Sequence, residues 1–253
     1  MSSWVSTLLN GVIVSGQYGV WTFPNPTQKL FKYLDQQFIS RDQHFYHTSQ
    51  FIYSFLKNIA FDTKWIVTVK DPTLYRRVSG SGPGADPLSI VGSFGFGGRF
   101  NIGTAQASLG NHPFKGLSVS PRGAHYSSED KTTARQEFGD VGMPGSTAVT
   151  YQLKLRKRKQ LKLIDADMAV RDLSSIFIAL PDIIQGGTLG GAYLDIKKII
   201  PTQLFAHWLL QHCPTKVDGI IFNSQVNPNK RNYCLHLATN EDCKKLLTII
   251  KKV

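Results

Sequence analysis

Gly-Gly-Arg-Phe-Asn at residues 97–101 opens the stretch that decides the fold, which closes at residues 125–137 with His-Tyr-Ser-Ser-Glu-Asp-Lys-Thr-Thr-Ala-Arg-Gln-Glu. The first motif is typical of a glycine turn that presents an arginine and an amide. The second predicts a strand end followed directly by a helix, because Ser127 can act as the N-cap and two acidic residues follow it. We expect Arg99 on the turn, Tyr126 at the strand end and Glu137 late on the helix. Together they form the parts of a pocket for a small anionic ligand.

Two flanking segments add candidate site residues. Leu74–Val78 predicts a strand that carries two adjacent arginines. Neighbouring strand residues point to opposite faces, so only one of Arg76 and Arg77 can face the pocket, and the sequence does not say which. We take Arg76 first and keep Arg77 as the alternative. Val217–Ser224 predicts a second strand, rich in β-formers, that ends in a serine.

The four motifs follow one another along the chain at residues 74–78, 97–101, 125–137 and 217–224. In this order they resemble the RES-domain family, which is named for an arginine, a glutamate and a serine. The resemblance extends from Thr73 to Leu237. It implies a fold similar to ADP-ribosyltransferases and an enzyme that degrades NAD, often as the toxin of a toxin–antitoxin pair. It therefore also implies a neutralising antitoxin or immunity protein as partner.

The resemblance also implies roles for the individual residues. Cleavage of the nicotinamide–ribose bond develops positive charge on the sugar, as in glycoside hydrolysis. Arginines suit the diphosphate because they form paired hydrogen bonds with phosphate oxygens. The expected catalytic residues are Arg76, Glu137 and Ser224, and the expected NAD-binding residues are Arg99, Asn101, Tyr126, Arg77 and Ser127. NAD is then a substrate, with no separate cofactor, and whether phosphate or water accepts the ADP-ribosyl group stays open.

The charge balance leaves two other functions open. The chain of 253 residues has a net charge of +12, which attracts polyanions or an acidic partner. The runner-up function is an ADP-ribosyltransferase that modifies a macromolecule, because the same transition state serves both reactions. The third is a nucleic-acid-binding protein that uses Arg156–Lys159, expected at an exposed hairpin turn, and the lysine-rich C-terminus. It is disfavoured because aromatic residues are not interleaved with this basic run.

Cysteine content and hydrophobicity bear on the compartment. The three cysteines are too few for a disulfide framework and lack metal-site spacing, which favours a reducing cytoplasm, of the protein's own cell or of a target cell. The apolar segment Trp4–Val20 is interrupted by polar residues and has no basic region before it, so we expect neither a membrane span nor a signal peptide. We expect no metal site.

The order of elements predicts an α+β fold, because short strands and helices interleave without regular βαβ repeats. With the family resemblance, this becomes an ADP-ribosyltransferase-like mixed or antiparallel sheet with flanking helices. We expect a helical extension at residues 1–70, with helices at 27–38 and from about 48, and a catalytic domain at residues 71–253. Further helices are predicted at 202–213 and 241–252. The sequence does not indicate an oligomeric state.

Overall fold

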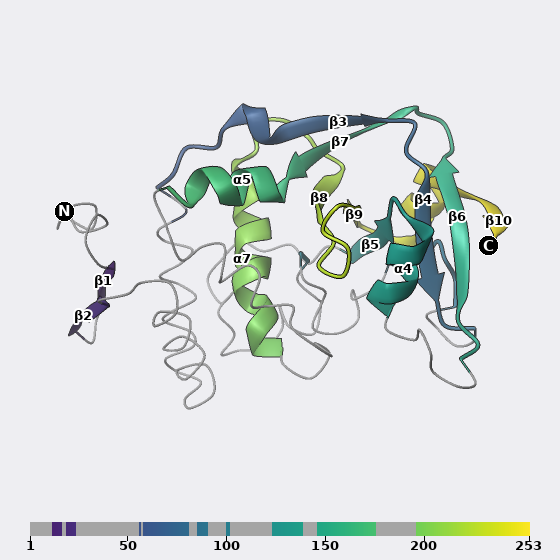
Figure 1. Cartoon of the computed structure of the whole chain (residues 1–253). Coiled ribbons are helices and arrows are strands. Elements are labelled where there is room, and N and C mark those ends of the chain that lie inside the picture. Colours follow the sequence, from purple (N-terminus) through teal and green to yellow (C-terminus); the bar gives the residue numbers. More distant parts are fainter. Residues whose placement is uncertain are drawn as a thin grey trace.

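The fold was determined from a computed structural model, shown in Figure 1. The structure describes residues 12–16, 19–23, 56, 58–80, 85–90, 100–101, 123–138, 146–175 and 196–253. The account below is confined to them, and for the first two segments and residues 196–201 it is confined to the backbone.

An eight-stranded mixed sheet is the centre of the molecule, with the order β10-β6-β4-β5-β9-β8-β7-β3. All neighbouring strands are antiparallel except β7 and β8, which are parallel. The strands are β3 (Ile66–Lys70), β4 (Leu74–Val78), β5 (Gly123–Ser128), β6 (Val149–Leu155), β7 (Gln160–Asp165), β8 (Gly219–Asn223), β9 (Arg231–Leu237) and β10 (Leu247–Lys252). The helices are the 3-10 helix η1 (Thr63–Trp65) and the α-helices α4 (Lys131–Phe138), α5 (Ala166–Leu173), α7 (Ile196–His212) and α8 (Asn240–Leu246). The α+β class is thus confirmed, and the likeness to ADP-ribosyltransferases stays a prediction.

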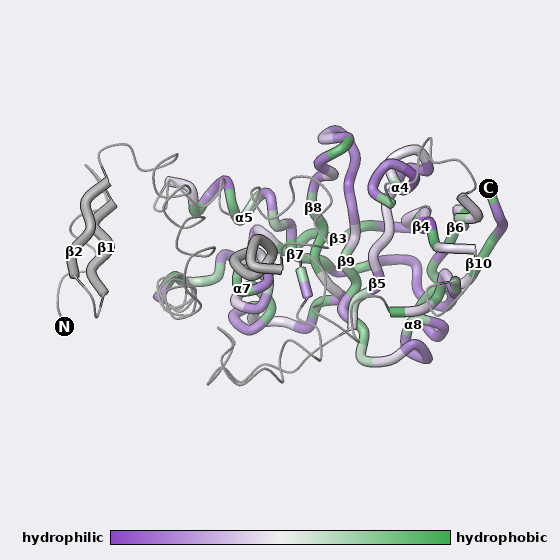
Figure 2. The backbone as a smooth tube through the Cα atoms, turned by 90° about the horizontal axis from the view of Figure 1, so that it is seen from below, coloured by the Kyte–Doolittle hydropathy of each residue, from purple (hydrophilic) through white to green (hydrophobic). Residues whose placement is uncertain are grey.

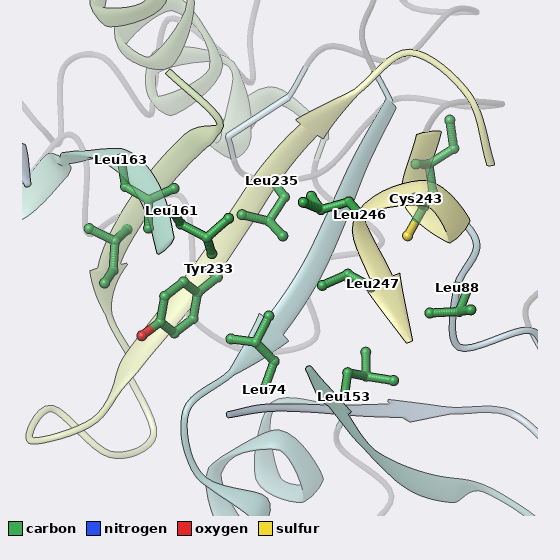
Figure 3. Close-up of a cluster of buried hydrophobic side chains, with 12 residues drawn as sticks. Leu74, Leu88, Leu153, Leu161, Leu163, Tyr233, Leu235, Cys243, Leu246 and Leu247 are labelled. Atoms are coloured by element: carbon green, nitrogen blue, oxygen red, sulfur yellow. The ribbon is translucent and has the colours of Figure 1, made fainter. Parts of the chain in front are cut away.

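The two faces of the sheet are covered by different elements. One face, here called the core face, carries a cluster of buried leucines together with Tyr233, and α8 adds Cys243 and Leu246 to it (Figure 3). Burial of each such leucine contributes roughly 1.5–3 kcal/mol. The other face, here called the α4 face, is covered by α4 beside β4 and β5. Figure 2 shows α4 and α8 on opposite sides of these strands.

Strand alternation assigns each side chain of β4 to one face. Leu74, Arg76 and Val78 are buried, whereas the intervening Tyr75 and Arg77 are only partly buried. Leu74 belongs to the core cluster, so Arg76 points to the core face. Arg77 therefore points to the α4 face. This settles the orientation that the sequence had left open.

The junction between β5 and α4 differs from the prediction. Ser127 and Ser128 both pair with β9, opposite Tyr233 and Asn232, so the strand continues past the expected cap. The helix is capped by Asp130 instead, whose carboxylate accepts a hydrogen bond of 2.8 Å from the N–H of Thr133. This bond is the main cause that lowers the pKa of Asp130 below its ordinary value. Cross-strand pairing has overridden the local capping preference of Ser127.

The C-terminal helix was predicted too long. Helix α8 ends at Leu246, and the next six residues form β10, which pairs with β6 at the edge of the sheet. Ile249 and Ile250 are β-branched and favour a strand once a partner is available. The sequence pattern alone did not reveal that partner, because β6 lies about a hundred residues earlier in the chain.

The basic run at residues 156–159 is exposed as predicted, but it is not a hairpin turn. The strands that it joins, β6 and β7, are not neighbours in the sheet. The connection between β3 and β4 lies beside this run, because β3 pairs with β7 and β4 pairs with β6. A hydrogen bond from the N–H of Asp71 to the carbonyl of Lys159 joins the two connections. Within the run, Arg158 forms an ion pair of 2.7 Å with Asp218.

Little of the expected helical extension falls within the described residues. β1 (Val12–Gly16) and β2 (Gly19–Phe23) form an antiparallel two-stranded sheet there. The helix predicted at 27–38 lies outside the described residues, and of the one predicted from about 48 only isolated positions are described. The helix predicted at 202–213 is confirmed within α7, which begins six residues earlier than expected. None of the described helices is both long and apolar enough to cross a lipid bilayer.

Candidate functional site

Side chains from two other elements bind the carboxylate of Glu137, which lies on α4. The hydroxyl of Ser224, just after β8, donates a hydrogen bond of 2.6 Å to Glu137 Oε1. The amide nitrogen of Asn232, on β9, donates a bond of 2.8 Å to the same oxygen. Within the described part of the chain, the second oxygen, Oε2, accepts no hydrogen bond. Glu137 itself is exposed, so the site presents a carboxylate that is held at one oxygen and open at the other.

The segment after β8 is built to hold Ser224 in this position. The hydroxyl of Ser224 accepts a hydrogen bond from the N–H of Asn227 (3.2 Å), and its own N–H donates to the carbonyl of Lys230 (2.8 Å). The side-chain amide of Asn227 donates to Thr133 on α4 (3.2 Å). Ser224 is 1% exposed. Its hydroxyl proton is used by Glu137, so its visible role is to orient that carboxylate.

The start of β9 is fixed by an ionic network beside Asn232. The guanidinium of Arg231 forms an ion pair of 2.7 Å with Asp165, at the end of β7. The backbone N–H of Arg231 donates to the carboxylate of Glu129, and its carbonyl accepts from the N–H of Glu129. Charge-assisted hydrogen bonds of this kind are the stronger ones in proteins. They hold β9, β7 and the segment before α4 in one arrangement.

Tyr126 lies farther along the same face and holds a second polar group. Its hydroxyl donates to Asn101 Oδ1 (2.8 Å) and accepts from the N–H of Phe100 (2.9 Å). Gln203 on α7 donates to the carbonyl of Asn101 (3.0 Å). Ser128 is the strand partner of Asn232. Tyr126 is two residues before Ser128, so the two positions on β5 are about 7 Å apart. Tyr126 and Asn101 therefore lie on the α4 face, two residues along β5 from the Ser128–Asn232 pair.

The two arginines of β4 have different surroundings. Arg77 lies on the α4 face and donates to the hydroxyl of Thr150 (3.1 Å). Arg76 lies on the core face, 4% exposed, and donates to the carbonyls of Pro87 (3.2 Å) and Ser89. Burial lowers the pKa of Arg76 to about 10. The structure thus brings Arg77, and not the preferred Arg76, to the face of Glu137.

Of the other sequence-predicted site residues, Ser127 lies on the core face, since it is opposite Tyr233 of the core cluster. Arg99 lies outside the described residues. Glu137, Ser224, Asn101, Tyr126 and Arg77 all lie on the α4 side of the sheet. Among these five, Glu137 contacts Ser224 and Tyr126 contacts Asn101, whereas Arg77 shares their side of the sheet.

Asn232 was missed by the sequence reasoning. The sequence pattern predicts a strand only at Tyr233–Leu237, which leaves Asn232 in the polar loop before it. In the structure it pairs with Phe222 on one side and Ser128 on the other, which extends β9 by two residues. Side-chain alternation was the available signal. Counted back by two from Cys234, it places Asn232 on the same face of the strand as Cys234, which is the α4 face.

The core face carries a second polar cluster, around His125. The ring Nδ1 of His125 contacts the guanidinium of Arg76 and lies 3.4 Å from the thiol of Cys243. Burial, and then the charge of Arg76, keeps the pKa of His125 well below its ordinary value. Burial raises the pKa of Cys243 to about 11. This cluster anchors α8 and residues 87–89 to the sheet, on the side away from Glu137.

We expect the protein to lose stability as the pH falls below about 6.5, the ordinary pKa of histidine. His125 stays neutral in the folded protein but takes up a proton in the unfolded chain, which favours unfolding by up to about 1.4 kcal/mol per pH unit. Urea unfolding at pH 7.5, 6.5 and 5.5 measures this. His125→Asn should flatten the dependence. A free energy of unfolding that is constant over this range contradicts the assignment.

No three histidine, cysteine, aspartate or glutamate side chains of the described residues gather into a group that could bind a metal ion. In a comparison with known families, the RES domain matches residues 73–251 of the chain. This range contains every predicted site residue. Searches of the curated proteins and of the solved structures found no match.

Proposed function

The chain belongs to the RES domain family, and from this we propose that it is a toxin of the toxin–antitoxin type that depletes NAD. In this proposal the protein cleaves the bond between nicotinamide and ribose. The observation that carries it is the carboxylate of Glu137, oriented by Ser224 and Asn232 through one oxygen and open at the other.

The geometry suits a reaction in which positive charge develops on the ribose. Nicotinamide is already a good leaving group, so the enzyme needs mainly to place negative charge near the reacting carbon and to hold the substrate. Glu137 supplies that charge through Oε2, which also accepts hydrogen bonds from ribose hydroxyls. Two fixed donors on Oε1 prevent the carboxylate from rotating away.

The remaining residues on the α4 face have roles in substrate binding. Arg77 provides the cation for the diphosphate, the role that the sequence had given first to Arg76. The ring of Tyr126 offers a surface for nicotinamide or ribose, and its hydroxyl keeps Asn101 in place. Ser224 orients Glu137 and does not bind phosphate, because its hydroxyl is already engaged.

Release of nicotinamide from NAD is the direct test. We expect the purified protein to release one nicotinamide for each NAD that is lost. Chromatography measures both compounds, in reactions with and without inorganic phosphate. A phosphorylated ADP-ribose product that forms only with phosphate identifies phosphorolysis, and free ADP-ribose identifies hydrolysis. If no nicotinamide is released under either condition, the proposal is wrong.

ADP-ribosyl transfer to a macromolecule is the second candidate, because an exposed carboxylate leaves room for a large acceptor. Labelled NAD distinguishes the two, since a transferase leaves the label on a protein or nucleic acid. A nucleic-acid-binding function has less support, because the basic run loses Arg158 to an ion pair with Asp218. Its sign would be a steep loss of binding as the salt concentration rises.

A neutralising antitoxin or immunity protein is part of the proposal. The net charge of +12 favours an acidic partner. The toxin then acts in a cytoplasm, where NAD is available, either in its own cell or in a target cell.

A further inference from the structure

Asn232 uses only one end of its side-chain amide. Its nitrogen donates to Glu137 Oε1 at 2.8 Å, whereas its oxygen, Oδ1, is buried and accepts no hydrogen bond in the described part of the chain. The orientation of the amide is fixed by chemistry, since a carboxylate oxygen accepts hydrogen bonds and requires the NH₂ group opposite it. The unpartnered atom is therefore a hydrogen-bond acceptor next to the reacting carboxylate.

The other polar groups in the hydrogen-bond network of Glu137 have partners. Ser224 donates to Glu137 and accepts from Asn227. Thr133 donates to Asp130 at 2.9 Å and accepts from Asn227. A buried carbonyl oxygen without a donor costs about 1–3 kcal/mol. A ligand that supplies the donor recovers this cost, so the oxygen marks a place where a ligand gains affinity.

We propose that Asn232 is a further substrate-contacting residue, whose Oδ1 accepts a hydrogen bond from a hydroxyl of the ribose that Glu137 engages. The inference rests on the proposed function. A ribose presents two hydroxyl donors on adjacent carbons. Glu137 Oε2 and Asn232 Oδ1 are two acceptors on side chains joined by one hydrogen bond, so together they match such a diol. Asn232 is 7% exposed, so the ribose is seated deep against β9. The site is thereby selective for a ribonucleotide over its deoxy analogue.

Binding of ADP-ribose tests this, because ADP-ribose has the terminal ribose but no nicotinamide. Calorimetry with Asn232→Ala should show binding weakened about tenfold or more, the loss expected for one buried hydrogen bond. Asn223→Ala, on the neighbouring strand but on the core face, is the matched control and should bind like the wild type. Two analogues of ADP-ribose each lack one hydroxyl of the terminal ribose, either the 2- or the 3-hydroxyl. The analogue that lacks the hydroxyl bound by Oδ1 cannot form this hydrogen bond, so it should bind equally to the wild type and to Asn232→Ala.

The wild type alone gives a second measurement if Asn232→Ala fails to fold. It should bind that analogue about tenfold more weakly than ADP-ribose. Equal binding of all three ligands overturns the inference and assigns a water molecule to Oδ1. A loss that appears with nicotinamide and not with ADP-ribose also overturns it, because the donor is then the carboxamide.

The outcome is separable from that of the proposed reaction. Binding of ADP-ribose that depends on Asn232, without nicotinamide release, supports the inference and refutes the reaction. Nicotinamide release with an unchanged KM for NAD and unchanged ADP-ribose binding in Asn232→Ala refutes the inference alone. If the protein neither binds ADP-ribose nor releases nicotinamide, both the inference and the proposed reaction are wrong.

Discussion

Glu137→Gln is expected to lower the kcat for nicotinamide release by at least about a hundredfold, because it removes the negative charge that stabilises the ribosyl cation. Ser224 and Asn232 can still donate to the oxygen of the glutamine side chain. The free energy of unfolding should therefore change by less than about 1 kcal/mol. The kinetic measurement is the initial rate of nicotinamide release at saturating NAD, and the stability measurement is urea unfolding. In cells, expression of the variant should no longer arrest growth.

Glu241→Gln is the matched control for this prediction. Glu241 is an exposed carboxylate on α8, on the other side of the sheet, where it contacts Lys244 at 3.4 Å. Its replacement should leave both kcat and growth arrest at the wild-type level. Growth arrest by Glu137→Gln, at equal expression, would remove Glu137 from the reaction.

Arg76→Met is expected to produce the largest loss of stability, about 2–4 kcal/mol. The substitution leaves the buried carbonyls of Pro87 and Ser89 without their donor, and each such group costs about 1–3 kcal/mol. Part of this is offset because the folded protein no longer buries a cation. The measurement is the free energy of unfolding in urea at pH 7.5. The KM for NAD should stay near the wild-type value in whatever fraction folds.

Arg77→Met provides the contrast, because the neighbouring residue points to the other face. It should change the free energy of unfolding by less than about 1 kcal/mol, because Arg77 is only partly buried and its bond to Thr150 is only partly shielded from water. It should raise the KM for NAD about tenfold through loss of a charge-assisted contact with the diphosphate. The opposite pattern, a stable but inactive Arg76→Met and a fully active Arg77→Met, would return the substrate-binding role to Arg76.

Elements with a local signal were predictable from the sequence. The strand at Leu74–Val78 and the strand ending near Ser224 were predicted nearly to their bounds, because alternation and β-propensity need only a few adjacent residues. The helix around Trp208 was predicted from its apolar stripe in the same way. The order of the site motifs along the chain was also sufficient to indicate the family, which the comparison over residues 73–251 then showed.

Which of these side chains meet depends on how the strands pair in three dimensions. The assignment of Arg77 to the face of Glu137, the loss of the cap at Ser127 and the entry of Asn232 into the site all follow from the register of β4, β5 and β9. A shift of one residue in such pairing moves every side chain to the opposite face. That register is set by strands about fifty to a hundred residues apart, so no short window of the sequence contains it. The same holds for β10, which becomes a strand because β6 offers an edge.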